Sequence, residues 1–302
     1  MRLTLLLAVA VIGQILFAQD RPRAPQPLPP GVQALRDLAY VDNGHARQKL
    51  DLYLPASADS TALRPLIIWI HGGGWKAGDK RQSPAVRLVS EGYAVASLDY
   101  RLSQDAVFPA QLEDCKAAVR WLRAHAAEYH LDPQKFAAWG SSAGGHLVAL
   151  LGTTGKTREF DVGANLNVSS AVQCVVDYFG PTDLLTMGSM SGPQSRIAHD
   201  DADSPEADLL GSPIQKNPKL ALRASPTTYV QAGAPPFLIV HGDADQTVPM
   251  GQSQLLDKKL RAAGDESTLH IVKGGGHGQG FGPDVFRLTE DFLKAHLKPV
   301  TQ

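Results

Sequence analysis

Neither an excess of charge of one sign nor a membrane-length apolar run is present in this sequence. The 302 residues contain 29 Lys and Arg and 30 Asp and Glu, so the formal net charge is −1. This balance excludes a polyelectrolyte tail and argues against nucleic acid as a partner. Hydrophobic residues make up 43% and charged residues 20%, a composition typical of a globular protein and not of a disordered one.

Cysteine is nearly absent. Cys115 falls in a helical pattern and Cys174 in a strand pattern, and their spacing matches no zinc motif. We expect two buried free thiols, because Cys is commonly a small core residue. The sequence alone leaves a disulfide open, since an exported chain can form one. Nothing else in the sequence calls for a metal or a cofactor, and we predict neither.

The first 18 residues have the layout of a secretory signal peptide. Arg2 supplies a positive charge, residues 3–12 are apolar except for Thr4, and Ala18 is a small residue at the end. The segment is shorter than the about 20 apolar residues that a membrane span needs. We predict cleavage near Ala18, a secreted or periplasmic protein, and no membrane association afterwards. An uncleaved anchor is the alternative.

The rest of the chain reads as one catalytic domain behind a tether. Five prolines between residues 22 and 30 make 19–31 an extended, proline-rich tether. The length by itself suggests about two domains. However, the candidate site described below draws on residues from 71 to 277, so we assign 32–302 to a single domain.

Strand and helix patterns alternate along this domain. Residues 50–54 alternate as in a half-buried strand. Continuous apolar runs predict strands that are buried on both faces, as in a parallel sheet, and stripes of apolar residues predict helices between them. The fold class is therefore α/β, with a mostly parallel central sheet flanked by helices. The runs that predict buried strands are 66–70, 93–98, 136–139, 174–179, 237–240 and 269–272, and those that predict helices are 112–126, 255–263 and 285–297.

A long segment without clear periodicity interrupts the alternation at about 182–232. We predict that it forms a small cap-like insertion that covers the site. Its acidic stretch at 199–208 does not have EF-hand spacing, so we expect a solvated loop there and not a calcium site.

The first candidate catalytic residue is Ser142. The sequence GSSAG at 140–144 follows the expected strand at 136–139 and precedes a helical run at 146–151. This is G-x-S-x-G in the strand, turn and helix context that it requires. Glycines flank the serine because so tight a turn crowds any nearby Cβ atom. Ser141 is the competing nucleophile, but the glycine spacing selects Ser142.

A glycine-rich loop follows the buried strand at 66–70. In the sequence HGGGW at 71–75, the glycines allow the backbone to come close to a substrate. Their N–H groups, with that of Ala143, are suited to bind an oxyanion. A phosphate-binding loop is excluded, because no G-K-[ST] follows and no G-x-G-x-x-G opens a helix. We expect His71 to brace the loop.

Two late loops supply an acid and a base. A serine nucleophile needs a histidine to take its proton and a carboxylate to orient that histidine. Ser142, Asp245 and His277 occur in the chain order that this kind of fold requires, each just after a strand. Ligands bind at that edge of open parallel sheets. Asp183 is a second candidate for the acid.

These motifs resemble those of the α/β-hydrolase superfamily. The chain is most similar to its branch of hormone-sensitive-lipase-like enzymes and acetyl or feruloyl esterases (BD-FAE-like). The resemblance covers residues 38–297 and implies that Ser142 is the nucleophile, His277 the base and Asp245, not Asp243, the acid. The motifs that carry it are HGGGW at 71–75, DYRL at 99–102, GSSAGG at 140–145, HGDADQTVP at 241–249 and GGGHG at 274–278.

The resemblance also assigns the oxyanion hole to Gly73, Gly74 and Ala143, with the Trp75 N–H as a further candidate. We expect the Trp75 side chain to line the pocket, since an aromatic face suits acyl or sugar groups. Tyr100 is a candidate substrate contact at the same edge of the sheet, although bracing is the simpler role for it.

The sequence therefore predicts a serine esterase that acts through an acyl-enzyme, without metal or cofactor. Its expected partners are small-molecule or polysaccharide-linked esters, such as acetyl or feruloyl groups of plant polysaccharide. A peptidase, amidase or arylformamidase of the same fold remains an alternative, as does a non-catalytic binding protein on this fold.

Overall fold

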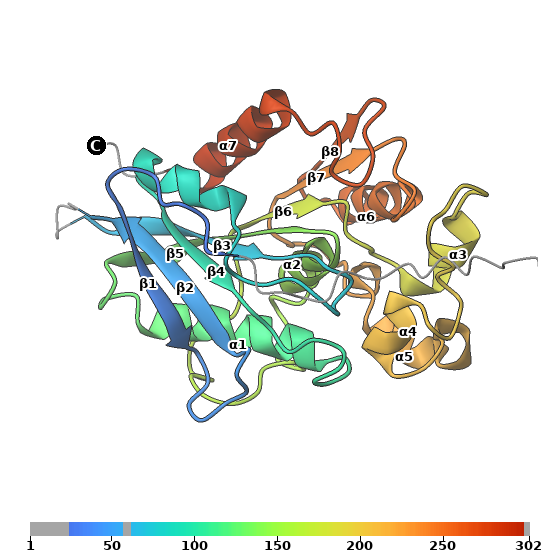
Figure 1. Cartoon of the computed structure of the whole chain (residues 1–302), viewed down its shortest axis with the longest axis horizontal. Coiled ribbons are helices and arrows are strands. Elements are labelled where there is room, and N and C mark those ends of the chain that lie inside the picture. The colour runs from blue at the N-terminus through green and yellow to red at the C-terminus, as the bar shows by residue number, and fades with distance from the viewer. Residues whose placement is uncertain (1–23, 57–61, 299–302) are drawn as a thin grey trace, which may run out of the picture.

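A computed structural model describes residues 24–56 and 62–298 of the chain. The predicted signal peptide at 1–18 lies outside the described residues. Within them, the strands form one eight-stranded sheet in the order β1-β2-β4-β3-β5-β6-β7-β8 (Figure 1). The strands are β1 (Val32–Ala39), β2 (Lys49–Pro55), β3 (Arg64–Ile70), β4 (Ala94–Leu98), β5 (Leu131–Ser141), β6 (Cys174–Tyr178), β7 (Phe237–Gly242) and β8 (Ser267–Val272).

The sheet is mostly parallel, which confirms the predicted fold class. Only β1 with β2 and β2 with β4 pair antiparallel in the described sheet, and every pair from β4 through β8 is parallel. β3, β4 and β6 are buried along their whole length, as their continuous apolar runs predict. The carboxyl ends of β5, β7 and β8 therefore meet at one edge of the sheet.

Two strands differ from the sequence prediction. β2 is not half-buried, because Asp51 and Tyr53 are as fully enclosed as the two leucines at 50 and 52. The Asp51 carboxylate accepts hydrogen bonds from Lys80 Nζ at 2.7 Å and from Arg36 at 3.1 Å, and these bonds compensate its burial. The sequence pattern does not predict β1, a partly exposed edge strand with little alternation.

Helices cover both faces of the sheet (Figure 1). On one face, α1 (Ala110–Ala124), α2 (Ala143–Thr153) and α6 (Gly251–Ala262) enclose one hydrophobic core. On the other, the 3-10 helix η1 (Pro84–Glu91) and α7 (Pro283–Leu297) enclose a second core. Cys115 belongs to the first core and Cys174 to the second, and both are free, which confirms the expectation of buried thiols.

The predicted insertion at 182–232 consists of short helices that gather at one end of the molecule, beside α6 (Figure 1). The expectation of a solvated acidic loop at 199–208 is wrong in part. His199 and Glu206 are 1% and 2% exposed, because they pair with each other inside the insertion. The insertion contains η2 (Leu184–Thr186), α3 (Met187–Met190), α4 (Pro205–Leu210), η3 (Ile214–Lys216), α5 (Pro218–Arg223) and η4 (Pro226–Thr228).

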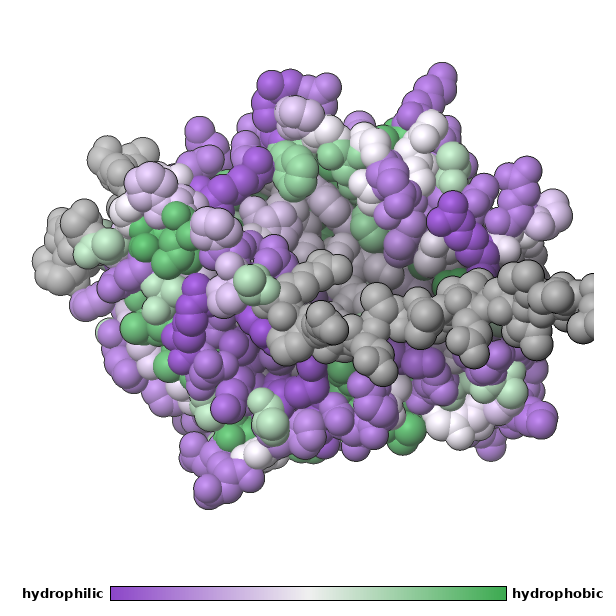
Figure 2. Space-filling model, viewed as in Figure 1, coloured by the Kyte–Doolittle hydropathy of each residue, from purple (hydrophilic) through white to green (hydrophobic). Residues whose placement is uncertain are grey.

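The described part of the proline-rich segment runs along residues 81–83. The N–H of Gln26 donates to the Arg81 carbonyl at 3.2 Å, and the Gln26 side chain accepts from the Ser83 N–H at 2.9 Å. None of the described helices combines the length and the apolar character that a bilayer crossing requires. The face in Figure 2 is largely hydrophilic, with hydrophobic side chains in small scattered groups.

Candidate active site

Ser142 lies in a strained turn between β5 and α2. Its backbone angles are φ 55° and ψ −121°, and its N–H donates to the Tyr178 carbonyl on β6 at 2.8 Å. A Cβ atom on Gly140 would lie 2.3 Å from the Gly144 oxygen, and one on Gly144 would lie 2.1 Å from the Ile70 oxygen. Glycine is therefore required on both sides, as the sequence predicts, and the turn holds the Ser142 hydroxyl at the edge of the sheet.

Three side chains from distant parts of the chain form a hydrogen-bonded relay. The Ser142 hydroxyl lies 2.9 Å from Nε2 of His277. On the other side of the ring, Nδ1–H of His277 donates to Oδ2 of Asp245 at 2.8 Å. The Asp245 carboxylate is fully buried, while the His277 side chain is 21% exposed. These contacts bring together the three residues that the sequence analysis selected from the ends of β5, β7 and β8.

Asp245 is held in place from several directions. Its Oδ1 atom accepts from the N–H groups of Thr247 at 2.7 Å and Val248 at 3.0 Å, and Nε2 of His241 lies 3.2 Å from Oδ2. Burial raises the pKa of Asp245, but the hydrogen bonds from His241, His277 and the backbone outweigh it and hold that pKa well below its usual value. The carboxylate is therefore charged and fixed in one orientation.

His241 is a supporting residue that the sequence pattern does not single out. It is fully buried at the end of β7, and its Nδ1 accepts from the Ser253 hydroxyl at 2.7 Å. A histidine that ends a buried apolar strand was the signal available in the sequence.

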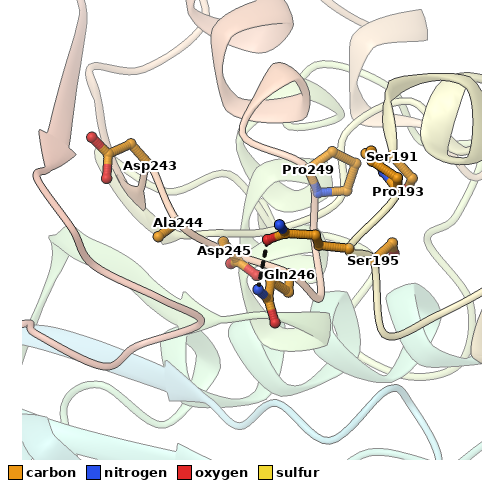
Figure 3. A pocket seen from close by; sticks show the side chains of 10 residues that line it. Ser191, Pro193, Ser195, Asp243, Ala244, Asp245, Gln246 and Pro249 are labelled. Atoms are coloured by element: carbon orange, nitrogen blue, oxygen red, sulfur yellow. Dashed lines mark hydrogen bonds between the residues drawn. The ribbon is translucent and has the colours of Figure 1, made fainter.

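The other two candidates for the acid lie elsewhere. Figure 3 shows Asp243 turned away from Asp245. Asp243 accepts from the Gly274 N–H at 2.6 Å and so ties the acid loop to the loop that carries His277. Asp183 accepts from the Thr227 hydroxyl at 3.3 Å and does not contact His277.

A cavity of about 320 Å³ lies between the loop that bears Asp245 and the insertion (Figure 3). This cavity lies between residues 191–195 and residues 243–246. Gln246 donates to Oε1 of Gln194 at 3.3 Å and accepts from Nε of Arg196 at 3.2 Å. The insertion thus supports the acid loop from outside.

The glycine-rich loop after β3 lies against the turn that bears Ser142. Gly73, Gly74 and Trp75 all have positive φ angles, of 114°, 60° and 57°. The N–H of Ala143, the first residue of α2, belongs to the first turn, where N–H groups have no intrahelical partner. All four residues line the cavity that contains Ser142 and His277. The predicted oxyanion residues therefore lie together at the wall of this cavity, beside the nucleophile.

Trp75 is among the residues that line the cavity, and its side chain is held by a buried histidine. Its Nε1–H donates to Nδ1 of His146 at 3.2 Å, and Nε2–H of His146 donates to the Ala224 carbonyl at 2.7 Å. Burial lowers the pKa of His146 to about 4 and outweighs the bond to Ala224. His146 is therefore a neutral, packed residue that links the oxyanion loop to the insertion.

Tyr100 does not line the cavity, contrary to the predicted substrate contact. It is fully buried, its hydroxyl donates to the His71 carbonyl at 3.0 Å, and its ring stacks on His71 with centroids 4.5 Å apart. His71 in turn donates from Nδ1 to the Gly72 carbonyl at 2.7 Å. Both residues brace the oxyanion loop, because their polar atoms are engaged by the protein itself.

The cavity above Ser142 has a volume of about 430 Å³ and walls that are largely apolar. The insertion closes one side of it with Ile197, His199, Pro205 and Glu206. Among the described residues, no cluster of His, Cys, Asp or Glu is arranged to hold a metal ion. The site offers a nucleophile, a base and backbone donors in a pocket of a size that suits small ligands.

Several known proteins that this chain resembles are esterases. Probable carboxylic ester hydrolase LipM of Mycobacterium tuberculosis is 31% identical over 242 residues, which are 78% of this chain and 53% of that protein. A truncated carbohydrate esterase from gut microbiota superposes with a TM-score of 0.81 at 35% identity and covers 88% of this chain and 96% of its own. Thermogutta terrifontis esterase 2, phosphorylated by paraoxon, gives a TM-score of 0.69 at 27% identity over 90% and 97%.

The fold is therefore that of the α/β-hydrolase esterases. The BD-FAE family matches residues 50–260, and the chain belongs to this family. It spans about half the length of the curated relative LipM.

Proposed function

We propose that this protein is a serine carboxylic-ester hydrolase that acts through an acyl-enzyme. The observation that carries the proposal is the continuous relay from Ser142 through His277 to Asp245, with distances of 2.9 and 2.8 Å. The esterase relatives of the chain support the same reaction class. A non-catalytic binding protein would have no need of so complete a relay.

In the acylation step, Nε2 of His277 takes the hydroxyl proton as Ser142 Oγ bonds to the ester carbonyl carbon. The charged Asp245 carboxylate stabilises the imidazolium that forms. The N–H groups of Gly73, Gly74 and Ala143, with that of Trp75 as a further donor, stabilise the oxyanion. The C–O bond to the alcohol then breaks, and His277 returns the proton to the leaving alcohol oxygen.

Water completes the cycle. His277 takes a proton from a water molecule as its oxygen attacks the acyl carbon, and the same oxyanion groups stabilise the second tetrahedral intermediate. The bond to Ser142 Oγ breaks, and the serine recovers its proton from His277. The carboxylic acid leaves, and no metal or cofactor takes part.

The assignment of Ser142 is tested with p-nitrophenyl acetate and a fluorophosphonate probe. We expect Ser142→Ala to lose nearly all turnover and all covalent labelling with its thermal unfolding unchanged, because only the nucleophilic oxygen is removed. Ser141→Ala, at the neighbouring hydroxyl, is expected to keep covalent labelling. Turnover by clean Ser142→Ala at the parent rate would show that the nucleophile is another residue.

We further propose that the natural substrates are short-chain or aryl esters, such as acetyl or feruloyl groups on plant polysaccharide. Similarity to a carbohydrate esterase and the leader-like residues 1–18, which suggest a secreted or periplasmic protein, support this proposal. The neutral overall charge suits uncharged esters better than charged partners such as nucleic acid. A panel of acyl lengths, acetylated xylan and methyl ferulate tests the substrate class, and N-terminal sequencing of exported protein tests cleavage near Ala18.

A further inference from the structure

Two buried polar residues that the proposed mechanism does not use, His199 and Glu206, line the cavity above Ser142. Nδ1 of His199 lies 2.9 Å from Oε1 of Glu206, and their side chains are 0% and 3% exposed. Both residues belong to the insertion and line the cavity together with Ser142 and His277 (Figure 1 shows α4, which carries Glu206).

Local structure fixes this pair. The Ser204 hydroxyl oxygen accepts from the Ala207 N–H at 3.1 Å and so caps α4, and Pro205 occupies its first position. Glu206 is the next residue, so the cap and Pro205 fix the backbone position from which its side chain extends. On the same helix, Asp208 instead pairs with Lys76 next to the oxyanion loop. α4 therefore presents one buried carboxylate, Glu206, and one that is only partly buried, Asp208.

Each member of the pair has a polar atom left over. Nε2 of His199 and Oε2 of Glu206 are buried and have no hydrogen-bond partner among the described residues. Buried polar atoms are nearly always satisfied in folded proteins, so two orphaned atoms on one pair at the wall of a cavity require an explanation. A purely structural brace would account for the bond within the pair but not for the two free atoms.

The chemistry of the free atoms defines what they bind. Oε2 of the Glu206 carboxylate is a hydrogen-bond acceptor, and Nε2 of His199 is a second polar ring atom of the same pair. Most of the other side chains that line the cavity outside the relay are apolar, including Phe179, Pro181 and Val248. The pair thus adds a free carboxylate acceptor, Oε2 of Glu206, and a ring nitrogen of His199 to an apolar pocket, and a hydroxyl group can contact both.

We infer that the His199–Glu206 pair recognises a hydroxyl group on the substrate ester. The inference rests on the proposed esterase function and narrows it to esters in which the group that enters the cavity carries a hydroxyl donor. Two sources share this chemistry. A partly acetylated sugar carries free hydroxyls on the alcohol side, and a ferulate ester carries a phenolic hydroxyl on the acyl side.

The first test compares matched substrates on the parent enzyme. One pair is an acetylated methyl xyloside with free hydroxyls and its O-methylated analogue, and the other is methyl ferulate and its O-methylated analogue. We expect kcat/KM to favour the free hydroxyl by at least about tenfold in one pair, because the buried acceptor of the pair loses its donor in the analogue. That pair identifies the source of the hydroxyl, and absence of preference in both pairs overturns the inference.

The second test uses Glu206→Gln and the matched variant Asp208→Asn on the same helix. Glu206→Gln places an amide donor where the free acceptor stood, so we expect the ratio of kcat/KM between the free and the O-methylated substrate to fall to about one. Asp208→Asn is expected to keep the preference. His199→Gln serves as a second variant if Glu206→Gln does not fold, and it is expected to reduce the preference too.

The outcomes separate the inference from the function on which it rests. An equal loss on all substrates, or a preference that survives in both variants of the pair, would make the pair a structural brace and overturn the inference. Failure of the parent enzyme on p-nitrophenyl acetate and on every other ester would instead overturn the proposed function.

Discussion

The Asp245 carboxylate shows how a buried charge is kept in a catalytic position. Two backbone N–H groups engage one of its oxygens, and the histidines at 241 and 277 approach the other. An isolated carboxylate in that place would take up a proton, because burial disfavours its charged form. Four donors reverse this preference, and the lowered pKa of Asp245 is the result.

We therefore expect Asp245→Asn to lower kcat by roughly 10⁴-fold, because the amide neither stabilises the imidazolium nor selects the correct tautomer of His277. The measurement is steady-state turnover of p-nitrophenyl acetate. Asp243→Asn is the control two residues away, and we expect it to keep kcat within about tenfold. A comparable collapse in both variants would mean that the loop as a whole, and not its second aspartate, limits the reaction.

At this scale the sequence predicts the relay residues well and the pocket poorly. Ser142, Asp245 and His277 could be predicted because each follows a recognisable strand and because their chain order is restricted. The roles of Tyr100, His199 and Glu206 depend on contacts across the fold. Tyr100 is enclosed by the oxyanion loop, and the pairing of His199 with Glu206 appears only once α4 folds back over the cavity.

Among the elements, the turn between β5 and α2 tolerates the least change. We expect Gly144→Ala to destabilise the protein by about 1–3 kcal/mol, the usual cost of overpacking, because its Cβ atom would meet the Ile70 oxygen at 2.1 Å. Chemical denaturation measures this loss, and turnover should fall as Ser142 is displaced. Gly192→Ala, where nothing lies within 4 Å of the added atom, is the control and should leave both quantities unchanged.

The neutral histidine of α2 makes stability depend on pH. Because burial lowers the pKa of His146 to about 4 from 6.5, the unfolded chain binds one proton more than the folded protein between these values. The stability that comes from burying His146 in its neutral form is complete above pH 6.5. The free energy of unfolding then falls by up to about 3 kcal/mol as the pH is lowered toward 4. We expect His146→Gln to remove that loss.

The measurement is the free energy of unfolding of both proteins from pH 7 to pH 4. Burial raises the pKa of Asp177 to about 6, which gives a slope of the opposite sign between pH 4 and 6. The difference between parent and variant cancels this contribution and isolates His146. Parallel curves for the two proteins would show that the pKa of His146 is the same in the folded and unfolded states.

The elements were predictable to the extent that their pattern was local. The buried parallel strands and the long helices have apolar runs or stripes that tertiary contacts do not alter. β1 and the enclosure of β2 were not predictable, because an edge strand is defined by its partner and Asp51 is buried only through Lys80 and Arg36. The short helices of the insertion are likewise fixed by packing.

For the molecule as a whole, the sheet separates the two cysteines. Cys115 and Cys174 lie in the cores on opposite faces, and burial raises the pKa of both thiols. We expect the midpoint of thermal unfolding to be the same with and without dithiothreitol, and two thiols to react with Ellman's reagent only after denaturation. A midpoint that falls on reduction would require a disulfide and therefore a different packing of α1 or β6.

The bond from His146 to the Ala224 carbonyl also restricts how this scaffold can be re-engineered. Segments such as 182–232 look like exchangeable modules, because they join the sheet at two neighbouring loops. In this protein, a graft that removed residue 224 would leave a buried ring N–H without its acceptor and would release the tryptophan of the oxyanion loop. A replacement of the insertion must therefore keep the Ala224 carbonyl in place. Otherwise His146 and Trp75 have to be redesigned together with the new segment.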